Sequence, residues 1–539
     1  MGKATIDYSL YLVTGREFLP PGKDYYESLE ESLQGGVTVV QVREKNIDTG
    51  KFIEIARRTK EITDKYGVPL LINDRIDVHL AVGSHGIHIG QTDMPLPLAR
   101  TLLGPDAIIG LSVSTPSEAQ LAVQQGADYV GIGPVWATGS KDVSAKVKLA
   151  PEGVGRVLEI LAGTGVEAVA IGGIHLPNLA QLLHGSISPT SRNHLSGIAT
   201  ISDIVGSPTP KDAAAALRAV VDSFKRARKS LGNPSSVFSL SSPEEPRSAE
   251  SLIRQVGVLM EVVRKHTPLV HQITNNVVIN DSANATLAVG ASPIMATNAR
   301  DVADLSKVIG ALLINFGTIT DKEGMLVAGR QANVNRKPLV FDPVAVGATA
   351  YRREASRELL SHWQPTVIKG NAAEIGALAE SNEVLSRGVD SVGSGFTDPA
   401  KVVKALAQKR AAVVVLTGVE DYISDGEIVL KASNGHELLG NITGSGCMTG
   451  TLVATFCAAA RLHYLASKEP FEDLSQLVQG DMLVGALAGV LVMTVAAEVA
   501  AARGDVKGPG TFRSALLDEL YNLRPEVLAQ RANVTVVQV

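Results

Sequence analysis

Polar side chains that suit a bound diphosphate follow three successive apolar runs in the first fifth of the chain. Gln41, Arg43 and Lys45 come directly after one run, Asp74 ends the next, and Asp93 follows the third. Arginine binds phosphate oxygens through a bidentate fork, lysine adds a point charge, and paired carboxylates hold Mg²⁺ against phosphate. The pattern therefore predicts a magnesium–diphosphate site.

A single strand end of this kind is typical of a surface ion pair, for example between Arg43 and Glu44 or between Lys45 and Asp74. Three consecutive strand ends that deliver such residues favour a functional site. The reason is that barrel enzymes build their active sites at the carboxyl ends of their strands.

A second group of residues lies in the glycine-rich turn at 440–450, directly before the apolar stretch 448–460. We expect this turn to open a helix whose free N–H groups stabilise phosphate during transfer. Cys447 lies at the expected helix start, where the dipole should lower the pKa of its thiol. The thiol would then accept a proton from a substrate hydroxyl or position it. The alternative is that Cys447 is a small core residue.

Three further strand-like runs of the C-terminal half end in residues that suit a nucleotide. Asp342 follows the first run, Lys369 and Glu374 follow the second, and Thr417 follows the third. Each alone is an ordinary capping or turn residue. Together they indicate a small-alcohol kinase that depends on ATP and Mg²⁺.

The N-terminal half alternates strand-like and helix-like segments, and eight such units predict a closed parallel (β/α)8 TIM barrel. The strand-like runs are residues 9–14, 37–42, 68–72, 86–89, 108–111, 129–132, 168–171 and 197–201. We interpret the polar stretch at 184–195 as an extended surface loop.

The stretch 231–248 is rich in Pro, Ser and charge, and we interpret it as a linker between domains at 1–230 and 249–539. After it, strand-like runs resume with another spacing, and short runs at 422–424 and 427–430 indicate an antiparallel edge. We expect an open three-layer α/β/α domain. Its other strand-like runs are residues 269–273, 292–296, 311–315, 338–341, 366–368 and 411–416.

Composition excludes several classes of protein. A net charge of −5 and the lack of an extended basic stripe argue against a nucleic-acid binder. Cys447 and Cys457 lie about 15 Å apart on one expected helix, too far for a disulfide. We expect the apolar run 482–497 to be a core helix without membrane association. With no signal-like start, the sequence predicts a cytoplasmic protein.

Residues 5–230 resemble thiamine phosphate synthase. The matching motifs are Tyr11-Leu-Val-Thr14, Gly35-Gly-Val-Thr38, Gln41-Val-Arg-Glu-Lys45, Ile72-Asn-Asp74, Gly86-Ile-His-Ile-Gly-Gln-Thr-Asp93, Gly126-Ala-Asp-Tyr-Val-Gly-Ile-Gly-Pro134 and Gly172-Gly-Ile174.

The resemblance implies binding of an aminopyrimidine diphosphate, with Arg43 and Lys141 acting on the leaving group and Asp74 and Asp93 on Mg²⁺. The implied diphosphate-substrate residues are Gln41, Arg43, Lys45, Asn73, Ser112 and Lys141. The residues implied for thiazole phosphate are Thr138, Gly139, Ser140, Gly173, Ile201 and Ser202.

Residues 252–539 resemble hydroxyethylthiazole kinase of the ribokinase-like group. The matching motifs are Ile273-Thr-Asn275, Gly290-Ala-Ser-Pro-Ile-Met295, Asp342-Pro343, Gly370-Asn-Ala-Ala-Glu374, Gly444-Ser-Gly-Cys447 and Gly508-Pro-Gly510.

The resemblance implies a thiazole site, an ATP site and a homo-oligomer, a trimer or a multiple of it. Cys447 is the implied catalytic residue. Most ribokinase-like enzymes have Asp at this position, so the identity of the base stays open. The implied residues are Asn275, Met295, Gly444 and Cys447 for the thiazole, and Asp342, Lys369, Glu374 and Thr417 for ATP.

A chain that carries both halves resembles the fused bifunctional thiamine-pathway enzymes of fungi. Three alternatives remain at this point. The barrel could be a sensor that binds without turnover, or a thiazole tautomerase that needs no metal. The second domain could instead phosphorylate hydroxymethylpyrimidine.

Overall fold

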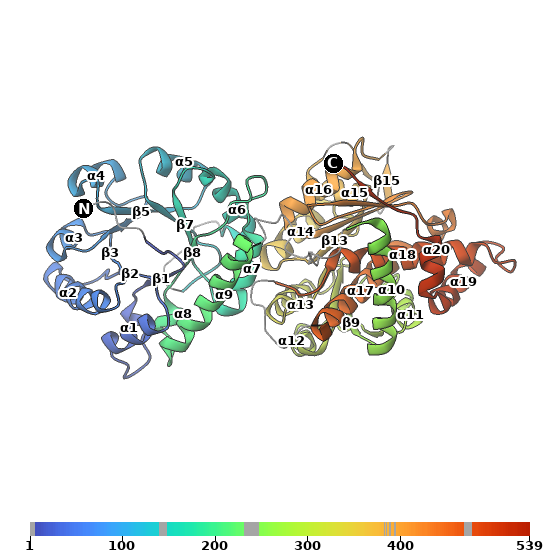
Figure 1. Cartoon of the computed structure of the whole chain (residues 1–539), viewed down its shortest axis with the longest axis horizontal. Coiled ribbons are helices and arrows are strands. Elements are labelled where there is room, and N and C mark those ends of the chain that lie inside the picture. The colour runs from blue at the N-terminus through green and yellow to red at the C-terminus, as the bar shows by residue number, and fades with distance from the viewer. Residues whose placement is uncertain are drawn as a thin grey trace. The chain divides into compact units, whose positions relative to one another are not determined.

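Short apolar runs separated by glycine, proline and polar turns form the strands of two compact units, which meet in the sequence near residue 233. We call them the barrel unit and the sheet unit (Figure 1). The computed structural model describes residues 6–139, 148–230, 247–381, 383, 385–387, 390–392, 395–467 and 477–539.

The barrel unit closes eight parallel strands into a barrel in chain order, which confirms the predicted (β/α)8 fold (Figure 1). The strands are β1 Leu10–Val13, β2 Val39–Val42, β3 Leu70–Asn73, β4 Gly86–Ile89, β5 Ile108–Val113, β6 Tyr129–Ile132, β7 Glu167–Ile171 and β8 Gly197–Thr200. The helices are α1 Tyr25–Gln34, α2 Thr49–Lys65, α3 Ile76–Val82, α4 Leu96–Leu103, α5 Pro116–Gln124, α6 Ala150–Leu161, α7 Leu176–Gly185, α8 Ser202–Val205 and α9 Pro210–Ser230, with a 3₁₀ turn, η1, at Arg16–Phe18.

The register of the barrel brings the polar ends of its strands to one rim. Leu71 of β3 pairs with Gln41 of β2, and Asn73 pairs with His88 of β4. β3 begins two residues later than predicted, because Pro69 has no N–H with which to donate a ladder hydrogen bond.

The predicted surface loop at 184–195 is only partly exposed. Helix α7 continues to Gly185, and Ser186 and Ser188 are buried. The carboxylate of Glu159 accepts the N–H groups of Thr190 at 3.1 Å and Ser191 at 3.0 Å. Because its own backbone groups are satisfied locally, this segment packs against the barrel instead of extending into solvent.

The sheet unit contains a nine-stranded sheet in the order β10-β9-β11-β12-β13-β16-β17-β18-β19. The strands are β9 Leu269–Ile273, β10 Ser292–Ile294, β11 Ala311–Asn315, β12 Leu339–Asp342, β13 Val367–Asn371, β16 Val413–Thr417, β17 Asp421–Ser424, β18 Val429–Ala432 and β19 Val534–Val537. The strands from β10 to β16 are parallel, and β17, β18 and β19 continue the sheet antiparallel. The predicted antiparallel edge is confirmed, and β19 extends it. A separate hairpin joins β14 Leu385–Arg387 to β15 Asp390–Val392.

Helices cover both faces of this sheet, which confirms the three-layer, ribokinase-like fold (Figure 1). One layer comprises α12 Ala299–Val308, α13 Lys322–Val334, α14 Ala350–His362, α15 Ala372–Ala379 and α16 Pro399–Arg410. The other comprises α10 Ala249–His266, α11 Ile279–Ala288, α17 Ser445–Ser467, α18 Met482–Ala501, α19 Pro509–Asn522 and α20 Pro525–Arg531. A 3₁₀ turn, η2 Glu437–Asn441, precedes α17.

Helix α18 is apolar on all sides. In the part of the chain that the structure describes, it is the one helix long and apolar enough to cross a membrane, and 89% of its most apolar window is buried inside the sheet unit. Helices α10, α17 and α19 pack against it. The expected core helix is therefore observed.

Candidate functional site

The charged residues predicted to bind a diphosphate lie after β2, β3 and β4. Lys45 forms an ion pair with Asp74, directly after β3, so this pair of the surface ion-pair alternative is observed. Asp93, in the loop after β4, accepts the Gly90 N–H at 2.7 Å and lies within hydrogen-bonding reach of Asp74. Burial and the Asp74 carboxyl raise the pKa of Asp93. Two carboxylates that share a site in this way suit a divalent cation, which would relieve their repulsion.

The backbone holds Asp74 in a left-handed conformation, with φ at +60°. Its N–H donates to the carbonyl oxygen of His88 at 2.8 Å. Few residues other than glycine adopt this conformation, and such strain is common where a side chain must be aimed at a ligand.

Arg43 lies at the same rim, but its ion-pair partner is Glu17 and not a carboxylate after β3 or β4. Its Nη1 is 3.6 Å from Glu17 Oε1, and its side chain is 15% exposed. The surface pair between Arg43 and Glu44 does not form, because Glu44 binds Arg16 at 2.6 Å. Arg43 therefore remains available to a ligand that competes with the more exposed Glu17.

A chain of hydrogen bonds crosses the interior of the barrel and joins two of the predicted residues. Gln41 Nε2 donates to the Tyr11 hydroxyl at 2.7 Å, and the hydroxyls of Tyr11 and Tyr129 are 2.8 Å apart. His88 continues the chain, with Nδ1 2.8 Å from the Tyr129 hydroxyl and Nε2 2.9 Å from Ser112 Oγ. Gln41 and Ser112, on β2 and β5, are thus held by one network.

Two glycines make room for this chain. A Cβ at Gly110 would lie 2.0 Å from a ring carbon of Tyr129, and one at Gly131 would lie 3.2 Å from His88 Cε1. Burial raises the pKa of both tyrosines, so their hydroxyls stay protonated.

Asn73 lies at the end of β3, beside Asp74, and is 7% exposed. Its Nδ2 is buried without a hydrogen-bond partner. Since buried donors are nearly always paired in folded proteins, this amide points to a missing partner such as a ligand oxygen.

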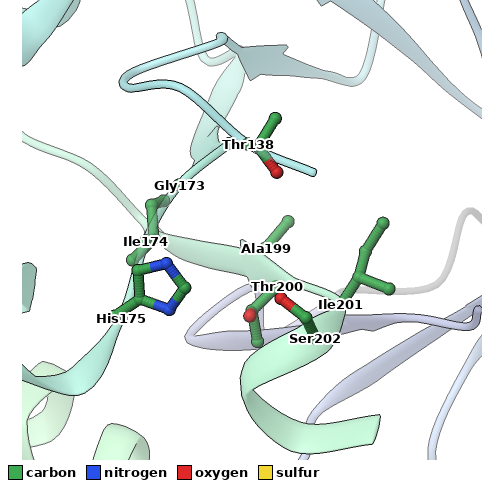
Figure 2. A pocket seen from close by; sticks show the side chains of 9 residues that line it. Thr138, Gly173, Ile174, His175, Ala199, Thr200, Ile201 and Ser202 are labelled. Atoms are coloured by element: carbon green, nitrogen blue, oxygen red, sulfur yellow. The ribbon is translucent and has the colours of Figure 1, made fainter. Parts of the chain in front are cut away.

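A pocket opens at the carboxyl ends of β7 and β8 (Figure 2). Four residues predicted for thiazole phosphate, Thr138, Gly173, Ile201 and Ser202, line it. Gly173 has φ at +68°, and a Cβ there would lie 2.6 Å from the Ala137 carbonyl oxygen, so the position requires glycine. The remaining lining residues are Gly172, Ile174, His175, Ala199 and Thr200. Gly139 follows Thr138, whereas Ser140 and Lys141 lie outside the described residues.

In the sheet unit, the predicted cation and carboxylate meet at the ends of two central strands. Lys369 Nζ on β13 is 3.3 Å from Asp342 Oδ1 at the end of β12. Asp342 is fully buried and Lys369 is 4% exposed. Burial raises the pKa of Asp342, while the nearby carboxylates, Asp342 foremost, raise that of Lys369 against the effect of its own burial. The pair is therefore held as a buried ion pair.

A second hydrogen-bond network links this pair to Cys447. Asp342 Oδ2 accepts from Asn315 Nδ2 at 2.9 Å. Asn275 Nδ2, after β9, donates to Asn315 Oδ1 at 3.1 Å and lies 3.5 Å from Cys447 Sγ. Asn275 and Cys447, both predicted for the thiazole site, are brought together.

The prediction that the helix start lowers the pKa of Cys447 is wrong. Burial, followed by the negative charge of Asp342, raises this pKa to about 11 against the opposing effect of Lys369. The thiol loses more solvation on burial than the helix dipole returns, so Cys447 is protonated at neutral pH.

The predicted glycine turn opens α17. Gly444 has φ at +84°, and its carbonyl oxygen accepts the Met448 N–H at 2.8 Å. The N–H groups of the first helical turn have no partner within the helix. A Cβ at Gly446 would lie 3.3 Å from Lys369 Nζ, so a buried cation sits directly behind this turn. The arrangement suits a transferring phosphoryl group.

The remaining predicted kinase residues are Glu374 on α15, Thr417 at the end of β16, and Met295. Glu374 accepts the N–H groups of Asn371 at 2.8 Å and Ala345 at 2.9 Å, and burial together with Asp342 raises its pKa to about 7. Thr417 Oγ1 donates to the Gly370 carbonyl oxygen at 3.4 Å. Met295 is half-buried just after β10.

Comparisons with known proteins match both units. A family model described as thiamine monophosphate synthase matches residues 10–204, and one described as the hydroxyethylthiazole kinase family matches residues 260–471. The probable thiamine biosynthetic bifunctional enzyme of Schizosaccharomyces pombe is 38% identical over 98% of this chain and 97% of its own length. The chain belongs to this family of bifunctional thiamine biosynthetic enzymes.

Two further relatives agree with this assignment. The thiamine biosynthetic bifunctional enzyme of Saccharomyces cerevisiae is 35% identical over 97% of this chain and 96% of its own length. A hydroxyethylthiazole kinase of a Roseiflexus species is 43% identical over 52% of this chain and 96% of its own length. This bifunctional transferase thus combines a synthase barrel with a kinase sheet.

Sequence reasoning about this bifunctional enzyme missed several residues in its two sites. Tyr11, His88 and Tyr129 lie inside motifs that were recognised, but a strand pattern shows only which face is buried. Asp421, at the start of β17, is buried and accepts the Gly418 N–H at 3.0 Å, and burial raises its pKa to about 7. A single carboxylate after a turn is usually exposed, so the sequence does not indicate that Asp421 is buried.

Proposed function

We propose that the sheet unit phosphorylates hydroxyethylthiazole with ATP, and that the barrel unit couples the thiazole phosphate to an aminopyrimidine diphosphate. The products of coupling are thiamine phosphate and diphosphate. The observation that carries the proposal is the convergence of Lys45, Asp74 and Asp93 at the rim that also carries the pocket after β7 and β8.

The residues present fit a Mg²⁺ ion. Asp74 and Asp93 lie within hydrogen-bonding reach of each other, and the pKa of Asp93 is raised partly by Asp74. The described residues hold no cluster of three His, Cys, Asp or Glu side chains suited to a metal. Mg²⁺ is commonly held by one or two carboxylates with substrate phosphates and water, so two suffice. When bound, the ion would neutralise diphosphate charge.

In the barrel unit, the residues bind and orient. Gln41, Asn73 and Ser112 hold the aminopyrimidine diphosphate, while Arg43, Lys45 and Lys141 balance the charge of its diphosphate. The C–O bond to diphosphate breaks, and the electron-rich pyrimidine stabilises the methylene cation that remains. The thiazole nitrogen then donates its electron pair to this carbon. No side-chain nucleophile is required, so catalysis rests on positioning and charge stabilisation.

Thiazole phosphate is held by its phosphate group in the pocket after β7 and β8. Thr138, Gly139, Ser140, Gly173, Ile201 and Ser202 form this site. Barrel enzymes commonly bind phosphate at this part of the rim, which supports the assignment.

In the sheet unit, Asn275, Met295 and Gly444 surround the thiazole, and Cys447 positions its hydroxyl group. A thiol whose pKa is about 11 holds its proton at neutral pH, which favours a positioning role over that of a ready-made base. Asp342, Lys369, Glu374 and Thr417 serve ATP and its metal ion. Lys369 supplies positive charge behind the glycine turn, where phosphate charge develops.

We also propose a cytoplasmic homo-oligomer, a trimer or a multiple of it, whose partners are small molecules and which does not bind nucleic acid or membranes. Val277 and Leu287, on the segment that follows Asn275, are 71% and 55% exposed, and an oligomer interface would cover such apolar side chains. Light scattering of the purified enzyme tests the assembly.

Product analysis by mass spectrometry tests the function. With Mg²⁺ and the aminopyrimidine diphosphate, we expect thiamine phosphate from thiazole phosphate without ATP, and from the free alcohol only with ATP. Phosphorylated thiazole without coupling would refute the synthase assignment. Metal-independent conversion of the thiazole alone would indicate a tautomerase.

A further inference from the structure

His175 lines the phosphate pocket of the barrel unit but has no role in the chemistry described so far. It directly precedes α7 and lines the same pocket as Thr138, Thr200 and Ser202 (Figure 2). Its side chain is 50% exposed, so a ligand can reach it. Among the described residues that line the pocket, His175 alone has an ionisable side chain.

The ring of His175 is held in one orientation by Asp203 of α8. Nδ1 is 2.5 Å from Asp203 Oδ1, and Asp203 Oδ2 accepts the Leu176 N–H at 3.0 Å. The backbone N–H of His175 donates to Asn178 Oδ1 at 2.8 Å. Because a carboxylate only accepts, Nδ1 must carry the hydrogen in this bond. Nε2 is then the ring atom that remains for a ligand.

Asp203 also favours the charged form of this imidazole. Its hydrogen bond raises the pKa of His175 above the usual value, against the opposing effect of burial. Among the described residues, Asp203 is the titratable group that acts on His175. Lys141, which follows the predicted phosphate residue Ser140, lies outside the described residues. The described part of the pocket therefore has one source of positive charge.

We propose that His175 binds the phosphate group of thiazole phosphate through Nε2 and makes the barrel unit selective for the phosphorylated thiazole over its free alcohol. The inference rests on the proposed coupling reaction. A phosphate monoester carries between one and two negative charges near neutral pH, whereas the alcohol has none for the imidazolium to bind. Charge-assisted hydrogen bonds of this kind are the stronger ones in protein sites.

The first test is steady-state coupling by the full chain with the substitution His175→Gln. We expect the KM for thiazole phosphate at pH 6 to rise about tenfold, because the variant loses one charge-assisted hydrogen bond to the phosphate. The KM for the pyrimidine diphosphate should stay within about twofold of the wild-type value, because a bond lost in one pocket has little effect on binding at a separate site. His85→Gln is the matched control. His85 precedes β4 at the opposite end of the barrel and accepts the Leu70 N–H at 3.1 Å.

The pH profile separates charge from packing. The ratio of variant KM to wild-type KM for thiazole phosphate cancels the ionisation of the ligand itself. We expect this ratio to be largest at low pH, where His175 is protonated, and to fall toward one as the pH rises through its pKa. In the Asp203→Asn variant, which keeps His175, the pH at the midpoint of the KM profile should be lower than in the wild type. The reason is that the substitution removes the charge that raises the pKa of His175.

Other outcomes would overturn the inference. Two results with folded His175→Gln would show that His175 is only a structural residue. The first is a KM ratio of 1 at every pH. The second is a KM ratio that does not change with pH, together with a raised KM for both substrates. If His175→Gln fails to fold, an unchanged profile for Asp203→Asn would overturn it as well. In each case wild-type synthesis of thiamine phosphate would keep the proposed function standing. A wild-type chain that makes no thiamine phosphate would overturn both.

Discussion

At the residue scale, both sites are organised by side-chain networks that join neighbouring strands. In the barrel, Gln41 donates from Nε2 to the Tyr11 hydroxyl, which joins β2 to β1. In the sheet, Asn275 bridges Asn315 and Cys447. Such networks fix the donor and acceptor pattern that a substrate meets, so binding needs little rearrangement.

We predict that Arg43→Ala lowers kcat/KM for coupling about 100-fold, because it removes a cation from the diphosphate site. ATP-dependent phosphorylation of the thiazole should stay unchanged in the same preparation. The comparison is made by separate assays of the two reactions, with Arg58→Ala as the control. Arg58 stacks on the ring of Tyr26, outside the barrel rim. Equal loss of both reactions in folded protein would contradict the assignment of two separate sites.

We predict that the kinase rate does not rise in proportion to the thiolate form of Cys447 between pH 6 and 8. Its pKa is about 11, so a mechanism that needed the free thiolate would gain about tenfold in rate for each pH unit across this range. The measurement is kcat against pH for wild type and Cys447→Ser. A log-linear rise in the wild type that is absent from the serine variant would show that Cys447 acts as the base.

The placement of charged residues at one edge of each sheet could be predicted from the sequence, because strand ends of parallel sheets share one edge. Lys45, Asp74, Asp342 and Lys369 lie where that rule predicts. The direction of the Cys447 pKa shift could not be predicted, because it depends on how deeply the thiol is buried. His88 and Tyr129 were missed for a related reason: their pairing depends on the space that glycines on neighbouring strands leave.

At the scale of elements, glycine positions set the shape of the barrel interior. Gly110 on β5 faces Tyr129 on β6, and β5 and β6 are hydrogen-bonded neighbours. The absence of a side chain on one strand is therefore what admits the ring on the next. Tyr129 in turn contacts Tyr8 and Tyr11, with ring centroids 4.8 and 5.9 Å apart.

We predict that Gly110→Ala destabilises the barrel unit by about 3 kcal/mol or more, because its Cβ would overlap a ring carbon of Tyr129. The ring must then move, which breaks its hydrogen bonds to Tyr11 and His88. Denaturant unfolding measures the change, with Gly50→Ala as the matched control. Gly50 lies in α2 with open space around its Cβ position, so alanine should stabilise the helix by up to about 1 kcal/mol. Equal stability of the two variants would contradict the packing argument.

The strands and central helices of both units were predictable because their apolar periods are regular. The segment at 184–195 was not, because its polar composition indicates exposure while Glu159 satisfies its backbone. β19 was also missed. It lies far along the chain from its partner β18, and sequence periodicity does not report such distant pairing.

At the scale of the whole molecule, two units with separate cores carry two consecutive reactions. The product of the sheet unit is the substrate of the barrel unit. The Roseiflexus relative, a separate hydroxyethylthiazole kinase, matches about half of this chain over nearly its whole length. The sheet unit therefore has the extent of an independent enzyme.

We predict that the two units, produced separately as residues 1–230 and 247–539, each keep their own reaction. Each has its own hydrophobic core, so each should fold alone. Assays of phosphorylation and coupling on each piece measure this, and circular dichroism checks folding. A folded piece that regains activity only when mixed with the other would contradict independence of the units.

Helix α18 has a consequence for synthesis of the chain on the ribosome. The segment Met482–Ala501 has a mean hydropathy of 2.1, and it offers no polar face to a growing polypeptide. Its packing partners include α19, Pro509–Asn522, which is translated later. Until α19 emerges, this segment lacks part of its final cover, and it resembles the segments that targeting factors and chaperones bind. Prompt packing of α19 against α18 is therefore a requirement of biogenesis, as much as of catalysis.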